Sequence, residues 1–237
     1  MSQKQHRALI VGGNGFVGQH VMALLAQQGW QLSCISRSGD KPKHLQGADF
    51  AWTESVEWLR ADGTELLEQD ITGYSALVCL VGAPPVPTLT QKAIATQRKL
   101  NAAANLNVIR LARTTSVERL VLVGAHIPRG LRSPIAGYFL GKRDCYREAR
   151  RFAEIPGKSA CVIQPPLIVG DRFTRNGLRI PLHKILKPLQ GLPFTTVMPV
   201  ETIAQVIVNF VTTSSSQAAT DAFQVIGPQQ LAQLTNQ

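Results

Sequence analysis

The chain has 237 residues, of which 44% are hydrophobic and 17% charged, so it can bury a sizeable core and is not intrinsically disordered. Its four cysteines form no C-x-x-C pair, which excludes a disulfide scaffold and argues against a zinc ribbon, and we expect no metal site. The net charge of +10 favours anionic partners such as nucleotide phosphates, an anionic membrane surface or an acidic protein.

Nucleic acid is a disfavoured partner, because aromatic residues make up only 6% of the chain and no zinc-finger or RNP pattern occurs. No apolar run approaches the roughly 20 residues that span a bilayer. The first ten residues lead straight into an apolar segment and leave no room for the core of a signal peptide. We therefore expect a cytoplasmic protein, whose basic surface leaves peripheral association with a membrane open.

Apolar segments and helix-like segments alternate through the first two-thirds of the chain. The apolar segments lack in/out alternation, which is typical of a parallel sheet covered by helices on both faces. We therefore expect an α/β fold with a doubly wound parallel sheet, the Rossmann fold. The predicted strands are residues 8–11, 32–36, 56–59, 76–81, 119–123, 160–164 and 222–226. The predicted helices are residues 15–28, 91–113, 138–153 and 201–212.

The character of the sequence changes after residue 165. Residues 171–199 are basic and interrupted by Pro and Gly, which leaves little room for a long element, and the residues after the last predicted strand are polar. We expect residues 1–165 to form a dinucleotide-binding domain. Residues 166–237 are then expected to form a small C-terminal lobe on the substrate side, with some elements returning to the sheet.

A glycine-rich turn follows the first predicted strand and opens the first predicted helix. One glycine permits the tight bend, a second lets a pyrophosphate approach the backbone, and a third lets helix and strand pack closely. The start of the helix adds unpaired N–H groups and the positive end of its dipole. In this context the G-x-G-x-x-G pattern predicts a dinucleotide site. Its residues are Gly12, Gly13, Asn14, Gly15, Phe16, Val17 and Gly18.

The end of the second predicted strand bears on the choice between NAD and NADP. A carboxylate there would bond the ribose 2′-hydroxyl of NAD and repel a 2′-phosphate. Arg37 stands at that point instead, between Ser36 and Ser38 and near Lys41, and a guanidinium suits a phosphate. The carboxylate of Asp40 would favour NAD, but Asp40 lies beyond Gly39. We therefore predict NADP(H) as the cofactor.

A tyrosine and a lysine lie one helical turn apart in the third predicted helix. Tyr138 and Lys142, at i and i+4, share one face of that helix. In hydride chemistry on a carbonyl or alcohol, such a lysine lowers the phenol pKa and holds the nicotinamide ribose, while the tyrosine exchanges a proton with the substrate oxygen. The spacing also fits an ordinary surface pair, and its place after the fifth predicted strand is what favours the catalytic interpretation.

These motifs resemble the short-chain dehydrogenase/reductase superfamily, in its extended and atypical branches. Four blocks occur in the family's order over most of the chain: residues 12–18, the Tyr138/Lys142 pair, residues 164–170 and residues 199–204. The last two are similar to the family's Arg-Pro-Gly…Tyr-Gly and Pro-Val-x-Asp-Val-Ala blocks. Among atypical members, the chain is similar to the NADPH-holding accessory subunit of respiratory complex I and to a ubiquinone-biosynthesis protein.

The resemblance implies further site residues. Asp62, after the third predicted strand, is similar to the family's adenine-contacting Asp. Gly82 and Ala83 are similar to the turn after the fourth strand, and Asn101 to the structural Asn of the fourth helix. The third block places Pro165 beside the cofactor in the same way.

One departure concerns the family's catalytic serine, which lies at the end of the fifth strand. Ala125 stands 13 residues before Tyr138 and has no hydroxyl to polarise a carbonyl. His126 and Ser133 are the alternative donors nearby. The proton-transfer machinery is therefore incomplete in the sequence.

Positive charges gather from Lys142 onward in two groups, residues 142–158 and residues 172–187. The second group is interleaved with apolar residues, so it fits either an anionic membrane surface, a lipid-like or quinone substrate, or an ordinary small core with solvated charges. Pro181 and Pro188 limit any helix there to about two turns.

Two functions remain open from the sequence. The first is an NADP(H)-dependent oxidoreductase acting on a small molecule, a carbonyl-type or quinone-like compound, with Tyr138 and Lys142 as catalytic residues. The second is a non-catalytic NADPH-binding accessory or assembly protein of a respiratory or ubiquinone-biosynthesis complex. The retained Tyr/Lys pair favours the first function, and the missing serine favours the second.

Overall fold

A computed structural model describes residues 6–174, 176–186, 196–213 and 221–235. Seven parallel strands form one sheet in the order β11-β6-β5-β4-β1-β2-β3. The strands are β1 (Arg7–Val11), β2 (Gln31–Ser36), β3 (Val56–Arg60), β4 (Ala76–Cys79), β5 (Arg119–Val123), β6 (Ser159–Ile163) and β11 (Phe223–Ile226). The predicted doubly wound parallel sheet is confirmed.

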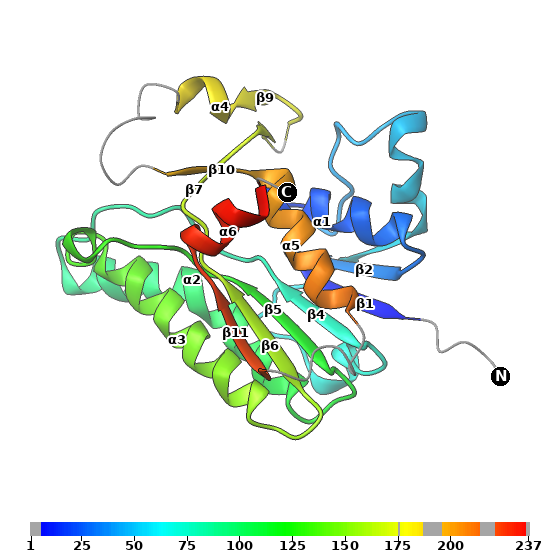
Figure 1. Ribbon diagram of the computed structural model, residues 1–237, viewed down its shortest axis with the longest axis horizontal. Coiled ribbons are helices and arrows are strands. Elements are labelled where there is room, and N and C mark those ends of the chain that lie inside the picture. Colours follow the sequence, from blue (N-terminus) through cyan, green and yellow to red (C-terminus); the bar gives the residue numbers. More distant parts are fainter. Residues whose placement is uncertain (1–5, 175, 187–195, 214–220, 236–237) are drawn as a thin grey trace.

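Helices cover both faces of this sheet (Figure 1). On one face lie α1 (Phe16–Gln27) and α5 (Val200–Thr212), and on the other lie α2 (Gln91–Ala112) and α3 (Ala136–Ala153). Strand β1 shows why its sequence is continuously apolar: Ala8 and Ile10 pack with the α1/α5 layer, and their neighbours Leu9 and Val11 with the α2/α3 layer. Burial on both faces replaces the in/out alternation of a half-exposed strand.

The strand order reverses between β1 and β4. From β1 the chain adds β2 and β3 on one side, and from β4 it adds β5, β6 and β11 on the other. The turns after β1 and β4 therefore diverge, which opens a crevice at the carboxyl ends of the strands. The residues predicted to contact a cofactor lie at or just after the carboxyl ends of β1, β2, β3, β4 and β6, except Lys142, which lies on α3.

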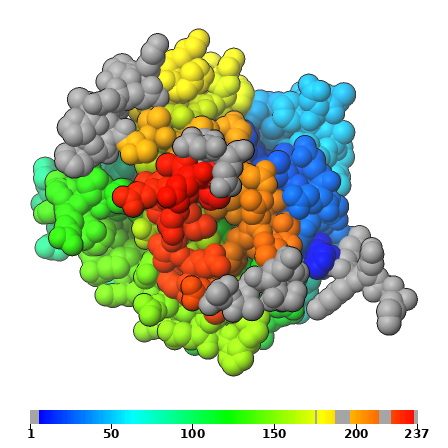
Figure 2. Space-filling view, viewed as in Figure 1, coloured from blue at the N-terminus to red at the C-terminus, as the bar shows by residue number. Residues whose placement is uncertain are grey.

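A small lobe stands over the carboxyl ends of the strands, at the top of Figure 1. It holds two short strand pairs, parallel β7 (Leu167–Val169) with β10 (Val197–Pro199) and antiparallel β8 (Asp171–Phe173) with β9 (Arg179–Pro181), followed by α4 (Leu182–Ile185). The chain then returns through α5 and β11 to the main sheet. The lobe abuts the segment that follows β2 (Figure 2).

Most boundaries of the predicted elements agree with the structure to within one residue, and the larger differences are at β4, at α3 and after β11. Strand β4 ends at Cys79, two residues early, and α3 begins at Ala136, two residues before Tyr138. The polar tail after β11 forms a further helix, α6 (Pro228–Thr235), which covers part of the α5 side (Figure 2). Leu231 is fully buried and packs this mainly polar helix against the hydrophobic core. The short 3-10 segments are η1 (Ala48–Ser55), η2 (Glu68–Ile71) and η3 (Arg129–Leu131).

All four cysteines are buried and free. Burial raises the pKa of the Cys34 and Cys161 thiols to about 12 and that of Cys145 to about 11, and it raises the pKa of Cys79 as well. They lie on β2, β4, α3 and β6 and serve as small core side chains. Among the described residues, no helix is both long and apolar enough to cross a membrane.

Candidate functional site

The glycine turn after β1 leaves no room for larger side chains. Gly12 has a positive φ of 86°, and a Cβ there would lie 3.1 Å from Val81. A Cβ on Gly18 would lie 2.4 Å from the main chain of Gly13, so these two glycines bring α1 onto the turn at close range. The turn therefore has the geometry that a dinucleotide cradle requires.

The first turn of α1 presents main-chain donors without an internal partner. Gly15 is the N-cap, no described side chain caps the helix, and Phe16, Val17 and Gly18 bring no acidic group to its first turn. Unpaired N–H groups at a helix start bind anions such as a pyrophosphate. The ring of Phe16 lies against Gly170 of the lobe, 3.2 Å from where a Cβ of that glycine would be.

A cavity of about 850 Å³ opens beside the turn, at the carboxyl end of β2. Its polar floor is a chain of hydrogen bonds: the Asn14 amide donates to the Ser38 hydroxyl at 3.4 Å, and the Gly39 N–H donates to the Ser36 hydroxyl at 3.1 Å. Arg37 lines the same cavity. The structure thus brings Asn14, Ser36, Arg37 and Ser38 together, as the sequence predicts.

Positive charge dominates this cavity. Arg37, Lys41, Lys43 and Arg60 all line it, against the single carboxylate of Asp40. Lys41 is partly neutralised, because its ammonium lies 2.6 Å from Glu54. The remaining excess suits a ligand group with two negative charges, such as a phosphate monoester.

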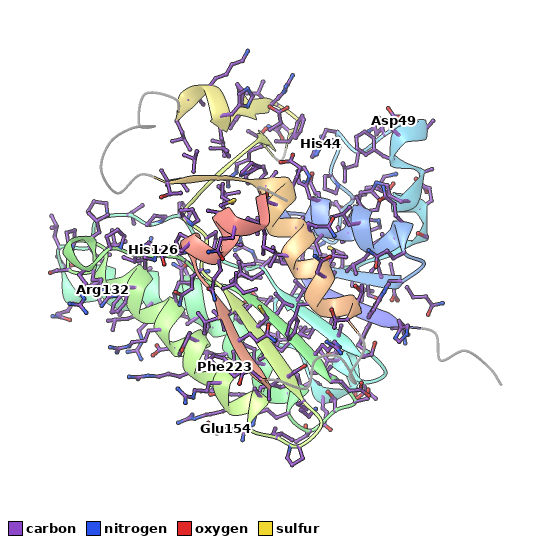
Figure 3. The ribbon with its side chains drawn as sticks, in the orientation of Figure 1. His44, Asp49, His126, Arg132, Glu154 and Phe223 are labelled. Carbon is purple, nitrogen blue, oxygen red and sulfur yellow. The ribbon has the colours of Figure 1, made fainter. Side chains whose placement is uncertain are left out.

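The far wall of the cavity is a ring pair that no sequence pattern indicated. His44, labelled in Figure 3, stacks on Phe173 of β8, with ring centroids 3.8 Å apart and an angle of 9° between the ring planes. The His44 ring also hydrogen-bonds Gln19 at 2.7 Å, and Gln19 donates to the main chain of Asn14 at 3.0 Å. The C-terminal lobe is therefore connected to the glycine turn through two side chains. Burial lowers the pKa of His44.

Asp62 lies just beyond β3, where the resemblance predicts an adenine contact. Its carboxylate accepts the N–H and the hydroxyl of Thr64 at 2.9 and 2.8 Å. These bonds lower its pKa, with smaller contributions from the charges of Arg37 and Lys99. Asp62 is thus held ionised, and it lies within electrostatic reach of Arg37.

The turn after β4 is fixed by a buried amide. The side-chain oxygen of Asn101, on α2, accepts the N–H of Ala83 at 3.0 Å, and its amide donates to Gln97. A Cβ on Gly82 would lie 3.1 Å from the Lys142 ammonium, so the glycine is needed for that approach. Gly82, Ala83, Asn101 and Lys142 therefore form one contiguous group.

Lys142 and Tyr138 share a face of α3, as their spacing predicts. The Lys142 ammonium donates to the main-chain oxygen of Val123 at 3.0 Å and lies 5.8 Å from the centre of the Tyr138 ring. Burial lowers the pKa of Lys142 and raises that of Tyr138 to about 12. The phenol is therefore protonated at neutral pH, the state needed to donate a proton.

A second cavity, of about 340 Å³, lies between the carboxyl ends of β5 and β6 and one side of α3. Ala125, His126 and Lys142 line it, whereas Tyr138 and Ser133 are not among its lining residues. The His126 N–H donates to the main-chain oxygen of the buried Pro165 at 2.9 Å, which joins the two strand ends. Of the two alternative donors, His126 reaches this cavity and Ser133 does not.

The family follows from a match to the model of the NAD dependent epimerase/dehydratase family, which extends over residues 8–187. The chain belongs to this family. It is part of the extended branch of the short-chain dehydrogenases, so the resemblance in the sequence is confirmed.

Two relatives share part of the sequence. The chloroplastic protein At1g32220 of Arabidopsis thaliana, whose own role is uncharacterized, is 29% identical over 193 residues, which is 80% of this chain and 59% of that protein. MIOREX complex component 2 of Saccharomyces cerevisiae is 34% identical over 56 residues, which is 24% of this chain and 20% of that protein. The chain thus spans less than two thirds of either relative.

Solved structures share the fold at low identity. YwfH, an NADPH dependent reductase involved in bacilysin biosynthesis, has a TM-score of 0.68 and 15% identity, covering 94% of this chain and 98% of its own. UDP-glucuronic acid 4-epimerase from Bacillus cereus, solved with UDP-glucuronic acid and NAD, has a TM-score of 0.68 and 14% identity, covering 93% and 76%. Both structures are therefore similar in fold to this chain.

Two residues of the first basic group (residues 142–158), Arg151 and Lys158, have partners within the fold. Buried Glu148 pairs with Arg110, Arg113 and Arg151 at 3.7, 3.3 and 3.4 Å. The Lys158 ammonium donates to three main-chain oxygens at the end of α2, those of Ala112, Thr115 and Val117. These residues therefore have structural partners.

The second basic group lies on the lobe. Arg179 pairs with Asp171 at 2.5 Å, and Leu178 and Ile185 are exposed. Arg175, Lys187 and Leu189, which the sequence assigns to the same group, lie outside the described residues.

Proposed function

We propose that this chain is an NADP(H)-dependent oxidoreductase that transfers hydride to or from a small carbonyl-type or quinone-like substrate. The observation that carries the proposal is the cavity at the end of β2, where Arg37 lies between Ser36 and Ser38 and positive charges outnumber the single carboxylate. A 2′-phosphate is the group on NADP(H), absent from NAD(H), that such a cavity fits. The name of YwfH as an NADPH dependent reductase supports the same cofactor.

In this proposal, each strand end holds one part of the nucleotide. The main-chain donors of Phe16, Val17 and Gly18 bind the pyrophosphate, and Gly15, whose own N–H donates to Gly12, lets it approach the backbone at the N-cap. Further cofactor contacts come from Gly12, Asn14, Ser36, Arg37, Ser38, Asp62, Gly82, Ala83, Lys142 and Pro165. The glycine turn and the cavity fit the nucleotide, because a Cβ would fill the turn and the cavity carries the complementary charge.

The reaction is divided between the cofactor and two side chains. The bound nicotinamide supplies or accepts the hydride at the carbonyl carbon. In the reduction Tyr138 donates its proton to the carbonyl oxygen, in the oxidation the Tyr138 phenolate takes the proton from the hydroxyl, and Lys142 provides the nearby positive charge that favours the phenolate. Lys142 is fixed for this by its bond to Val123.

A second function is a non-catalytic NADPH-binding protein that serves a respiratory or ubiquinone-biosynthesis complex. Ala125 in place of a hydroxyl residue favours it, as does the position of Tyr138 outside the lining of the second cavity. MIOREX complex component 2 is named as part of a complex, which agrees with a role of this kind. Cytoplasmic location, peripheral membrane contact and an acidic protein partner stay predictions for either function.

The deciding experiment is a fluorescence titration of the purified protein with NADPH and NADH. We expect tighter binding of NADPH, and we expect Arg37→Gln to weaken it by about ten- to a hundredfold while NADH affinity hardly changes, because charged hydrogen bonds contribute this much. The control is Arg147→Gln, which removes an exposed guanidinium on α3 far from the cavity. Equal losses for both nucleotides would show that the 2′-phosphate site is elsewhere.

Turnover then separates the two functions. Oxidation of bound NADPH by a panel of aldehydes, ketones and quinones would support the oxidoreductase. Tight NADPH binding with no turnover across the panel would favour the non-catalytic protein.

A further inference from the structure

The second cavity has one apolar wall and one charged rim. Phe139 and Tyr146 on α3, with Ile127 and Val162, provide the apolar surface. Arg132 precedes α3, Arg143 lies about two turns along it, and both line the same cavity. A volume of about 340 Å³ suits a compact molecule about the size of a substituted benzene ring.

The charge of this cavity is not balanced by the protein. Arg132, Lys142 and Arg143 line it, and no carboxylate is found among its described lining residues. All 15 acidic side chains of the chain belong to described residues, and none of them forms an ion pair with Arg132 or Arg143. Three cations around one apolar cavity are a recognition site for an anion.

The two guanidinium groups are held in place by one ring. Arg132 lies 5.0 Å and Arg143 lies 5.8 Å from the centre of Phe139, and the Arg132 guanidinium also donates to the main chain of Ile127 at 3.4 Å. Cation–π contacts orient an arginine without neutralising it, so its outer N–H groups stay available to a ligand. Figure 3 shows Arg132 and His126 at the same end of the molecule, near the start of α3.

We propose that this cavity binds the carboxylate of the substrate, a small carbonyl compound with a flat apolar part, and that Arg132 and Arg143 are the residues that select it. The carboxylate bonds the two guanidinium groups, and the apolar part packs on Phe139 and Tyr146. This proposal rests on the proposed function in one respect, that the ligand is the substrate of the oxidoreductase.

The cavity and the proton donor share one residue. Lys142 lines the cavity and lies one helical turn from Tyr138, near the centre of its ring. A molecule anchored at Arg143 therefore lies beside Lys142, the preceding residue of α3. The carboxylate anchor supplies orientation that the missing hydroxyl at Ala125 does not.

Two probes that differ in a single group test the proposal. Phenylglyoxylate carries a phenyl ring, a ketone and a carboxylate, and acetophenone replaces the carboxylate with a methyl group. Calorimetric titration of the full chain, with and without saturating NADPH, measures the affinity for each. We expect phenylglyoxylate to bind about a hundred times more tightly than acetophenone, since two charged hydrogen-bonding groups contribute about tenfold each.

Variants then assign the preference to the two arginines. Arg132→Gln and Arg143→Gln should each reduce it about tenfold, and the double variant should abolish it, while Arg147→Gln keeps it. Both arginines are exposed, and neither forms an ion pair with a described residue, so the variants are expected to fold, which a thermal melt verifies. A carboxylate preference that persists in the double variant would overturn the proposal, and so would equal binding of the two probes.

The two proposals fail in different ways. The titration without nucleotide tests the cavity even if NADPH does not bind. A chain that binds NADPH with the expected preference but treats both probes alike would retain the cofactor proposal and lose this one.

Discussion

The two ends of the crevice are equipped differently. At the β2 end, the glycine turn, two serines and Arg37 surround a large cationic cavity, and hydrogen bonds hold its floor together. At the β5 end, Lys142 is bound to the main chain, Ala125 has no hydroxyl, and Tyr138 does not line the adjacent cavity. The end that we propose for the nucleotide carries the predicted groups, and the end that we propose for the chemistry lacks a hydroxyl donor.

This difference teaches that binding and turnover are separate requirements on one fold. A parallel sheet provides main-chain donors and a crevice wherever the turn after β1 is glycine-rich, and these suffice to hold a nucleotide. Hydride transfer further requires an acid placed at the substrate oxygen. The molecule can therefore be altered at one end without loss at the other.

The largest expected effect is the loss of kcat when the proposed proton donor, Tyr138, is replaced. Tyr138→Phe should reduce kcat by about 10²- to 10⁴-fold, because general acid catalysis contributes this much, while NADPH affinity changes less than twofold. Burial raises the pKa of Tyr138 to about 12, so the phenol is the proton-carrying form throughout the neutral range. Stopped-flow oxidation of NADPH, with Tyr74→Phe at the opposite ends of the strands as control, measures it. Unchanged kcat would remove Tyr138 from the mechanism.

The next effect concerns the start of α1, where we propose that the pyrophosphate binds. Gly15 has φ −80° and ψ 178°, which any residue adopts, and a Cβ there would touch only the Gly12 oxygen, at 3.1 Å. Gly15→Asp should therefore cap α1 and raise the unfolding free energy by roughly a few tenths of a kcal/mol. The same carboxylate occupies the donors and repels phosphates, so NADPH affinity should fall by about a hundredfold.

Urea unfolding and NADPH titration of the Gly15→Asp protein give the two numbers. Gly15→Ala is the control, since it adds the same Cβ without a charge and should lose far less affinity. A Gly15→Asp protein that is stabilised and still binds NADPH tightly would contradict the assignment of the pyrophosphate to α1.

The smallest effect concerns the ring pair that joins the lobe to the nucleotide end. Burial against Phe173 lowers the pKa of His44 below 6.5, so the folded state binds a proton less readily than the unfolded state. Stability is then full above about pH 6.5 and falls as the pH drops below it. His44→Phe keeps a stacked ring but cannot titrate, and its unfolding free energy should fall less between pH 7 and pH 5.

His20 contributes to the same slope, because burial lowers its pKa too, with a partial offset from Glu201. Urea unfolding of both proteins at the two pH values gives the comparison. Identical slopes would mean that protonation of His44 does not oppose the stack.

Much of the fold could be predicted because its signals are local. Strand β1 is apolar throughout since both of its faces are covered, and the glycines after it leave one conformation. The lobe could not be predicted, because β7 pairs with β10 thirty residues away and three-residue strands carry no periodicity. Helix α6 was missed because one buried leucine, Leu231, anchors an otherwise polar segment.

The site divides in the same way. The neighbours in sequence, such as Ser36 to Ser38 or Tyr138 and Lys142, lie where their spacing indicates. The bond from Lys142 to Val123 and the stack of His44 on Phe173 join residues 19 and 129 positions apart, and no local pattern encodes either. The pairing of Arg132 with Arg143 at Phe139 depends on the path of the loop before α3.

The four buried cysteines should react only slowly with thiol reagents while the chain is folded. A buried thiol with a raised pKa is neither accessible nor ionised at neutral pH, so maleimides and iodoacetamide should pass it by until the core opens. A fluorophore can therefore be attached through a cysteine introduced on the lobe without removing the native four. Conversely, the rate at which the native thiols become alkylated reports how often this sheet opens.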